Sequence, residues 1–310
     1  ISPGEKVLVA VAGEFGARFA EILRVTGADV QTLETKWGTA VDPAEVRAAL
    51  ERDASIRAVV VTHNETSTGV TMDLPAIRKA IPRDDVLLIV DAISSAGAIE
   101  IRQDEWGIDA VVVGSQKGLM TPPGLAAVSL SAKAWGKVER TVSRSVYWEF
   151  KAARKFLERP APQTPYTPAV SLLFTMRESL RMLEAEGLEN AFRRHAALAG
   201  AVRAGVRAMG MQTLAGDDCA SNTVTAVVLP EGLDGQRLLS TLAKRYGVVL
   251  AGGQGPLAGR IIRIGHVGSV SWREVVVALA ALEMACVDLG RPVERGRAVA
   301  AAEEALTAGG

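Results

Sequence analysis

Two short apolar runs that are continuous rather than alternating limit what this chain can fold into. They span residues 86–90 (VLLIV) and 110–113 (AVVV). Continuous runs of this kind are typical of strands buried on both faces of a parallel sheet. The first run ends in Asp91, and the second ends in Gly114-Ser115-Gln116-Lys117. We therefore expect an acid and an amine at the carboxyl ends of two strands, which is where open α/β sheets bind ligands.

Asp91 and Lys117 are the residue types that a pyridoxal phosphate (PLP) site needs. A lysine forms a Schiff base with the cofactor, and an acidic side chain pairs with the pyridinium nitrogen. A helix cap and a solvated loop lysine are the alternative roles for these two residues, and the pair alone leaves both interpretations open.

The composition is that of an ordinary globular protein, long enough for one large domain and a smaller one. The 310 residues are 48% hydrophobic, and 35 Lys and Arg balance 35 Asp and Glu. This balance gives no reason to expect nucleic acid or an acidic membrane surface as a partner. The sequence shows no signal peptide and no apolar run near the roughly 20 residues of a membrane span. The two cysteines and three scattered histidines lack metal-ligand spacing, so we expect no metal site and a cytoplasmic, reducing compartment.

Strand and helix patterns alternate along the first half of the chain, which predicts a doubly wound, mainly parallel sheet. Two long helical patterns, broken at Gly187, follow an irregular stretch at residues 140–167. Shorter strand patterns come after them, at residues 223–229, 248–250 and 261–264. We therefore expect a large domain over residues 1–186 and a smaller α+β domain over residues 187–310.

The central stretch VDAISSAGAIEI…WGIDAVVVGSQKGLMTPPG resembles the class V aminotransferases, and within them the alanine–glyoxylate and serine–glyoxylate group. The resemblance covers nearly the whole chain. It implies the PLP-dependent transferase fold of type I, with one antiparallel strand in the large sheet. It also implies that Lys117 carries the cofactor and that Asp91 pairs with the ring nitrogen.

Three further motifs carry family roles onto this chain. AGEFGARFAEI puts Phe15 where an aromatic residue stacks on the cofactor ring, although a core Phe at a helix start is the alternative. THNETSTG gives Thr66 a hydrogen bond to the cofactor, and Gln116 also fixes its polar edge. RIIRIGH matches a motif whose arginine, here Arg263, holds the substrate carboxylate through its two-pronged guanidinium. A surface arginine at a strand edge is the alternative for Arg263.

The segment QTPYTP at residues 163–168 resembles the family segment that crosses a dimer interface. This implies that Thr167, and by a weaker match Tyr166, reach the cofactor phosphate of a neighbouring subunit in a homodimer with shared sites. A proline-rich surface loop is the alternative. The family's phosphate-binding turn falls before Ile1, so we expect an N-terminally truncated chain that holds PLP poorly or not at all.

The resemblance implies a transaminase that moves the amino group of alanine or serine to glyoxylate or a similar 2-oxo acid, with Lys117 as the base. Two alternatives stay open. One is a class V lyase of the cysteine-desulfurase type, which needs a His over the ring and a reactive Cys on a mobile loop. The other is a truncated, non-catalytic chain. The first strand is not followed by GxGxxG, which argues against a Rossmann dehydrogenase.

Overall fold

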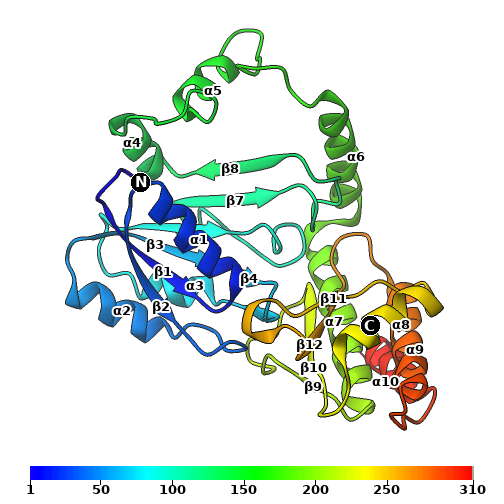
Figure 1. The fold of residues 1–310 in the computed structure, drawn as a ribbon. Helices are drawn as coiled ribbons and strands as arrows, with labels where there is room; N and C mark the ends of the chain where they lie inside the picture. Colours follow the sequence, from blue (N-terminus) through cyan, green and yellow to red (C-terminus); the bar gives the residue numbers. More distant parts are fainter. Residues whose placement is uncertain (309–310) are drawn as a thin grey trace.

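A six-stranded sheet in the order β2-β1-β3-β6-β7-β8 organises the first 130 residues of the computed structural model, which describes residues 1–308 (Figure 1). Its strands are β1 (Lys6–Val11), β2 (Asp29–Glu34), β3 (Ile56–Thr62), β6 (Leu87–Asp91), β7 (Ala110–Gly114) and β8 (Ala126–Leu130). Neighbouring strands from β2 to β7 are parallel, and β8 pairs antiparallel with β7. The mainly parallel sheet and its single antiparallel strand agree with the sequence-based expectation.

Helices cover both faces of this sheet, which explains the continuous apolar runs. The helices α2 (Pro43–Arg52) and α3 (Leu74–Lys79) pack on one face, and α1 (Glu14–Val25) packs on the other. Alternate residues of β1 point to opposite faces of the sheet. Leu8 packs in the core under α2 and α3, and Val9 packs in the core under α1. Asp42 caps α2 by accepting a hydrogen bond from the Ala44 amide at 2.8 Å.

The parallel register brings three strand ends to one edge of the sheet. Asp91, the last residue of β6, pairs with Thr62 at the end of β3 and with Val112 in β7. The loops that follow these strands therefore meet at the same edge. The short hairpin of β4 (Asn64–Glu65) and β5 (Val70–Thr71) lies in the first of these loops.

The middle of the chain extends away from the large sheet. The helices here are α4 (Ala132–Arg140), α5 (Phe150–Leu157) and α6 (Val170–Glu186), and Figure 1 shows α5 and its flanking loops projecting between the other two. The sequence predicted an irregular stretch here, so α5 is a correction. It buries no residue, although Phe150, Ala153 and Leu157 recur at helical spacing and give an amphipathic pattern that sequence reasoning overlooked.

A second sheet, in the order β11-β12-β10-β9, is antiparallel and has its own hydrophobic core. Its strands are β9 (Gln212–Thr213), β10 (Val224–Val228), β11 (Ala251–Gly252) and β12 (Ile261–Gly265). The accompanying helices are α7 (Leu188–Ala208), α8 (Gly235–Tyr246), η1 (Gly255–Leu257), α9 (Trp272–Asp288) and α10 (Arg297–Ala308). The predicted strand at 248–250 was wrong, because pairing with β12 begins only at Ala251.

Gly187 separates α6 from α7 and has a φ of 83°, which favours glycine. We propose that the chain divides there into residues 1–186 and 187–310. Within residues 1–308, no helix has the length and apolar character needed to cross a membrane.

Candidate active site

A cavity of about 540 Å³ lies at the edge of the large sheet where β3, β6 and β7 end. It brings together five of the seven residues singled out from the sequence: Phe15, Thr66, Asp91, Gln116 and Lys117. The other lining residues are Arg18, Phe19, Ile22, Thr62, Asn64, Ile93, Ser94 and Val112. The acid and the amine predicted at two strand ends therefore share one cavity.

Asp91 presents a buried carboxyl group in the wall of this cavity. The residue is 8% exposed, and its Oδ1 accepts a hydrogen bond from the Ile93 amide at 2.9 Å. No cationic side chain of residues 1–308 forms an ion pair with it. Burial raises the pKa of Asp91, and the negative charge of Glu65 adds to the effect. Such a carboxyl group suits a ligand that brings its own positive N–H group.

Lys117 lies in a tight turn just after β7. The Met120 amide donates to the Lys117 carbonyl at 2.9 Å, and Met120 has a φ of 51°, the only positive value for a non-glycine residue in the described part of the chain. Gly118 packs directly on the loop after β6, since a Cβ at this position would lie 2.2 Å from the carbonyl oxygen of Ala96. This backbone contact fixes the lysine loop against the loop that follows Asp91.

Thr66 belongs to a chain of hydrogen bonds at the polar side of the cavity. Its hydroxyl donates to Ser94 Oγ at 3.0 Å, and Ser94 donates to the Asn64 carbonyl at 2.8 Å. Sequence reasoning missed Ser94, and its only signal was its place three residues after Asp91. Thr66 therefore stands beside the Asp91 loop, where its hydroxyl is available to a polar ligand.

Phe15 and Arg18 line the cavity from the first turns of α1. The Arg18 guanidinium carbon lies 5.0 Å from the centroid of the Phe15 ring, within the range of a cation–π contact. Sequence reasoning missed Arg18, although a residue three positions after Phe15 falls on the same helix face. The cavity thus has an aromatic ring with a cation next to it on this side.

Arg263 lies on β12 of the second sheet and reaches the Thr66 loop. Its Nε donates to the Gly252 carbonyl at 2.8 Å, and its Nη1 donates to the Thr66 carbonyl at 3.2 Å. The side chain is half-buried, and burial lowers its pKa while the charge of Glu65 opposes that effect. Nη2 has no hydrogen-bond partner among residues 1–308, so it is free to bind an acidic ligand.

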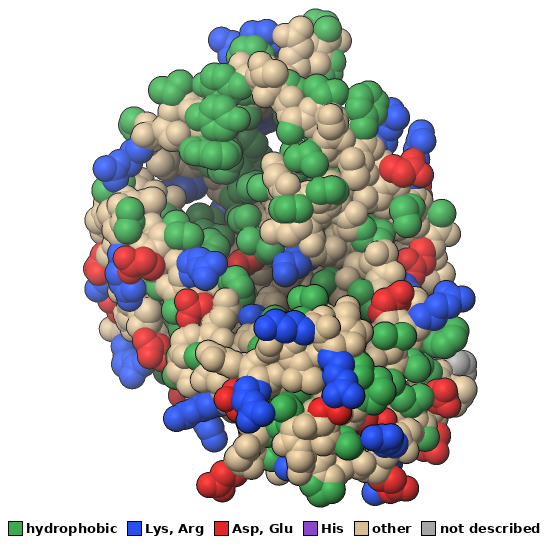
Figure 2. Space-filling model, turned by 45° about the vertical axis from the view of Figure 1, so that its right-hand side comes forward, with side chains coloured by type: hydrophobic (Ala, Val, Ile, Leu, Met, Phe, Trp, Pro, Cys, Tyr) green, Lys and Arg blue, Asp and Glu red, His purple; other side chains and the backbone are tan. Residues whose placement is uncertain are grey.

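Thr167 does not line the cavity that holds Asp91 and Lys117. It lines a neighbouring hollow of about 690 Å³, and the two spaces share Ile93, Val112 and Gln116. Figure 2 shows a hollow in the upper half of the molecule with hydrophobic side chains gathered around it. The role of Thr167 at a partner's site stays a prediction, since the structure holds one chain.

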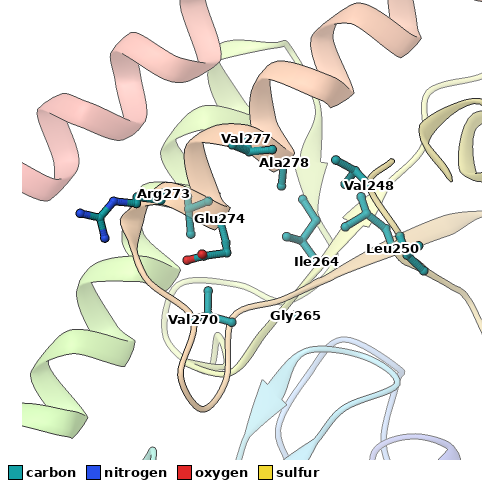
Figure 3. A pocket seen from close by; sticks show the side chains of 11 residues that line it. Val248, Leu250, Ile264, Gly265, Val270, Arg273, Glu274, Val277 and Ala278 are labelled. Carbon is teal, nitrogen blue, oxygen red and sulfur yellow. The ribbon is translucent and has the colours of Figure 1, made fainter. Parts of the chain in front are cut away.

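A third cavity, of about 400 Å³, lies between β12 and α9 (Figure 3). Its walls are mostly aliphatic, and Arg273 points away from it in the close-up view. Glu274 is engaged in capping α9, because its carboxylate accepts from the Ser271 amide at 2.7 Å. This cavity contains none of the predicted site residues and offers no comparable acid–base pair.

Comparisons with known proteins agree with this geometry. The family model "Aminotransferase class-V" matches residues 1–262. The serine–glyoxylate aminotransferase of Methylorubrum extorquens is 40% identical over an alignment that covers 99% of this chain and 78% of that protein. The structure of ureidoglycine–glyoxylate aminotransferase from Bacillus subtilis aligns with a TM-score of 0.92 and 33% identity, over 99% of this chain and 80% of that one. Pyridoxamine–pyruvate aminotransferase from Mesorhizobium loti gives a TM-score of 0.91 and 33% identity, over 100% and 80%. The predicted fold is confirmed by these two structures.

Proposed function

Because the chain belongs to the class-V aminotransferase family, we propose that it is a PLP-dependent transaminase that moves the amino group of a small amino acid to glyoxylate or a similar 2-oxo acid. Alanine and serine are the donors we expect. The observation that supports this most directly is the single cavity shared by Asp91, Lys117 and Phe15. The relatives that act on glyoxylate support the choice of acceptor.

The residues of the cavity fit PLP. The buried Asp91 carboxyl lacks a cation of its own, which matches a protonated pyridine nitrogen. The Lys117 amine has no ion-pair partner within residues 1–308, so it is available for the cofactor aldehyde. When bound, PLP supplies the electron sink that makes the α-proton of an amino acid acidic.

Each residue of the candidate site has a defined role in this proposal. Asp91 keeps the proton on the ring nitrogen, and Phe15 packs against the ring. Lys117 would hold the cofactor, and its Nζ, when not bonded to it, would serve as the general base that carries the α-proton. Arg263 orients the substrate carboxylate, because two of its nitrogens are already anchored to backbone carbonyls. Thr66 and Gln116 hydrogen bond to the polar edge of the cofactor.

A homodimer with shared sites is the second part of the proposal. Large apolar side chains are exposed along the segment that carries Thr167, among them Val142, Val146, Tyr147, Trp148, Leu157, Val170 and Phe174. Contiguous exposed apolar surface marks interaction sites. We place the interface on this segment, with Thr167 and Tyr166 directed at the partner's cofactor phosphate. Mixing inactive Lys117→Ala and Thr167→Ala chains should restore activity if one subunit supplies each residue.

The lyase alternative has less support. A desulfurase needs a thiolate, but burial raises the pKa of Cys286 to about 11 and also raises the pKa of the half-buried Cys219. Phe15 stands where that class would place a histidine. Both cysteines are free thiols, which supports a cytoplasmic, reducing location for the transaminase.

Covalent trapping tests the proposal. The chain is mixed with PLP, reduced with borohydride and digested, and the labelled peptide is sequenced. We expect the label on Lys117, its loss in Lys117→Ala, and no change in Lys244→Ala, which alters an exposed lysine on α8. Label on another lysine, or retained label in Lys117→Ala, would overturn the assignment. Amino donors are then screened with glyoxylate as acceptor.

A further inference from the structure

Glu65 has a fully buried carboxylate that no site role has yet explained. The residue is 0% exposed, and its two oxygens accept hydrogen bonds from backbone and hydroxyl donors only. The distances are 2.9 Å to the Gly16 amide, 3.1 Å to the Phe15 amide and 2.5 Å to Ser67 Oγ. Since every partner is a donor, the group is bound as a carboxylate.

The Glu65 carboxylate acts as the N-terminal cap of α1. The residue at the N-cap, Gly13, has no side chain, and α1 has no capping hydrogen bond from its own N-terminal residue. Glu65 instead satisfies the free amides of the first turn from a distant loop, where negative charge also suits the helix dipole. The Phe15 amide is one of those amides, so Glu65 holds the residue whose ring lines the cavity.

The residues at the start of α1 pack closely against the loop that carries Glu65. A Cβ on Gly13 would lie 2.4 Å from Ser67 Oγ and 2.7 Å from the Glu65 side chain. The Glu14 amide donates to Ser67 Oγ at 2.9 Å, and Thr68 donates to the Ala12 carbonyl at 3.1 Å. These contacts therefore fix the start of α1 relative to the loop at the end of β3.

The same loop also contacts the groups on the other sides of the site. Thr66, the next residue, accepts from Arg263 through its carbonyl and donates to Ser94. Burial raises the pKa of Asp91 and lowers the pKa of Arg263, and the charge of Glu65 adds to the first effect and opposes the second. Glu65 thus holds the start of α1, while the next residue, Thr66, contacts Arg263 and the loop after Asp91.

We propose that Glu65 is a positioning residue that acts through Phe15: its carboxylate fixes the first turn of α1 so that the Phe15 ring lies against the cofactor. This inference rests on the proposed PLP site, but the hold of Glu65 on α1 is independent of it. The experiment therefore has one arm without cofactor and one arm with it.

The first arm measures amide hydrogen exchange of the free protein. In Glu65→Gln the side chain keeps its size but presents an NH₂ group to amide donors. We expect the Phe15 and Gly16 amides to exchange roughly tenfold faster than in the wild type, while the amides of β3 stay unchanged. The control is Glu21→Gln, an exposed position on the same helix, which should change neither set. Unchanged exchange at Phe15 in Glu65→Gln overturns the inference.

The second arm is a double-mutant cycle on PLP affinity with Glu65→Gln, Phe15→Ala and the combined variant. If Glu65 acts through Phe15, the Glu65→Gln substitution weakens PLP binding by roughly tenfold in the wild-type background. The same substitution has no effect in the Phe15→Ala background. Additive losses would mean that Glu65 acts on the cofactor by another route and would overturn the inference. A wild-type chain that binds no PLP would favour the non-catalytic alternative over the proposed function, and the exchange arm alone would then decide on Glu65. Should Glu65→Gln fail to fold, Ser67→Ala removes one donor to the same carboxylate and should shift both readouts in the same direction.

Discussion

Gly118 offers a sharp test of how Lys117 is held in place. Replacing it with alanine adds a Cβ that would lie 2.2 Å from the Ala96 carbonyl oxygen, about 0.8 Å inside the 3.0 Å below which real Cβ contacts essentially never fall. The obstacle is backbone, which cannot rotate away, so the lysine loop and the loop after Asp91 must move apart. Overpacking of this kind costs about 1–3 kcal/mol.

Displacement of the loop should harm the chemistry more than the fold. A shift near 1 Å between reacting groups can reduce a rate by roughly 100-fold. We expect Gly118→Ala to lose about 1–3 kcal/mol of unfolding free energy in urea and to attach PLP at Lys117 at a rate lower by a factor of roughly 10 to 100. Attachment is followed by the absorbance of the Schiff base after PLP is added.

Gly200 provides the matched control for this substitution. It lies inside α7, and a Cβ there would meet nothing within 4 Å. Gly200→Ala should therefore stabilise the protein by about 0.5–1 kcal/mol and leave the attachment rate unchanged. Wild-type stability and a wild-type attachment rate in Gly118→Ala would refute the reasoning that the two loops fix the lysine by direct contact.

Three further perturbations follow from the site. Arg263→Ala should raise KM for the amino acid by roughly 30- to 160-fold, because it removes charged hydrogen bonds of about 2–3 kcal/mol, and it should leave PLP affinity nearly unchanged. An unchanged KM in steady-state assays would remove Arg263 from the substrate site. Asp91→Asn should reduce the single-turnover rate by roughly 100-fold with the fold intact by circular dichroism, and a wild-type rate would contradict its role at the ring nitrogen. Burial lowers the pKa of His63 from 6.5 to about 4, so the unfolded chain binds the extra proton first, and unfolding free energy should fall as pH drops from 6.5 toward 4. His63→Gln should flatten that slope in urea titrations, and an unaltered slope would assign it to other groups.

Sequence reasoning predicted that Asp91 and Lys117 lie close together because both residues follow the ends of strands. Once β6 and β7 are recognised as parallel neighbours, their register fixes Asp91 next to the loop of Lys117. Arg18 and Ser94 were missed because their role depends on which way a helix face and a loop point, and no residue pattern states that. The place of Thr167 depends on a second chain, which one sequence does not describe.

The two errors in predicted secondary structure both concern short apolar patterns. The helix α5 has apolar residues at helical spacing, Phe150, Ala153 and Leu157, but the pattern covers only eight residues and was overlooked in a stretch interpreted as irregular. The error at residues 248–250 has the opposite cause. Val248 and Leu250 do pack on the small core, and their apolar character predicted a strand although the paired residues begin at Ala251.

The two backbone anchors of Arg263 have an entropic consequence. A free arginine loses much of its rotamer freedom when it grips a ligand, at a cost of about 0.5–1.5 kcal/mol. Here the hydrogen bonds to the Gly252 and Thr66 carbonyls already restrict the side chain before any ligand arrives. The entropic cost of ordering the Arg263 side chain is therefore incurred on folding, so the proposed contact with a substrate carboxylate would lose less entropy on binding. A restrained arginine of this kind selects ligands by the position of their acid group as well as by its charge.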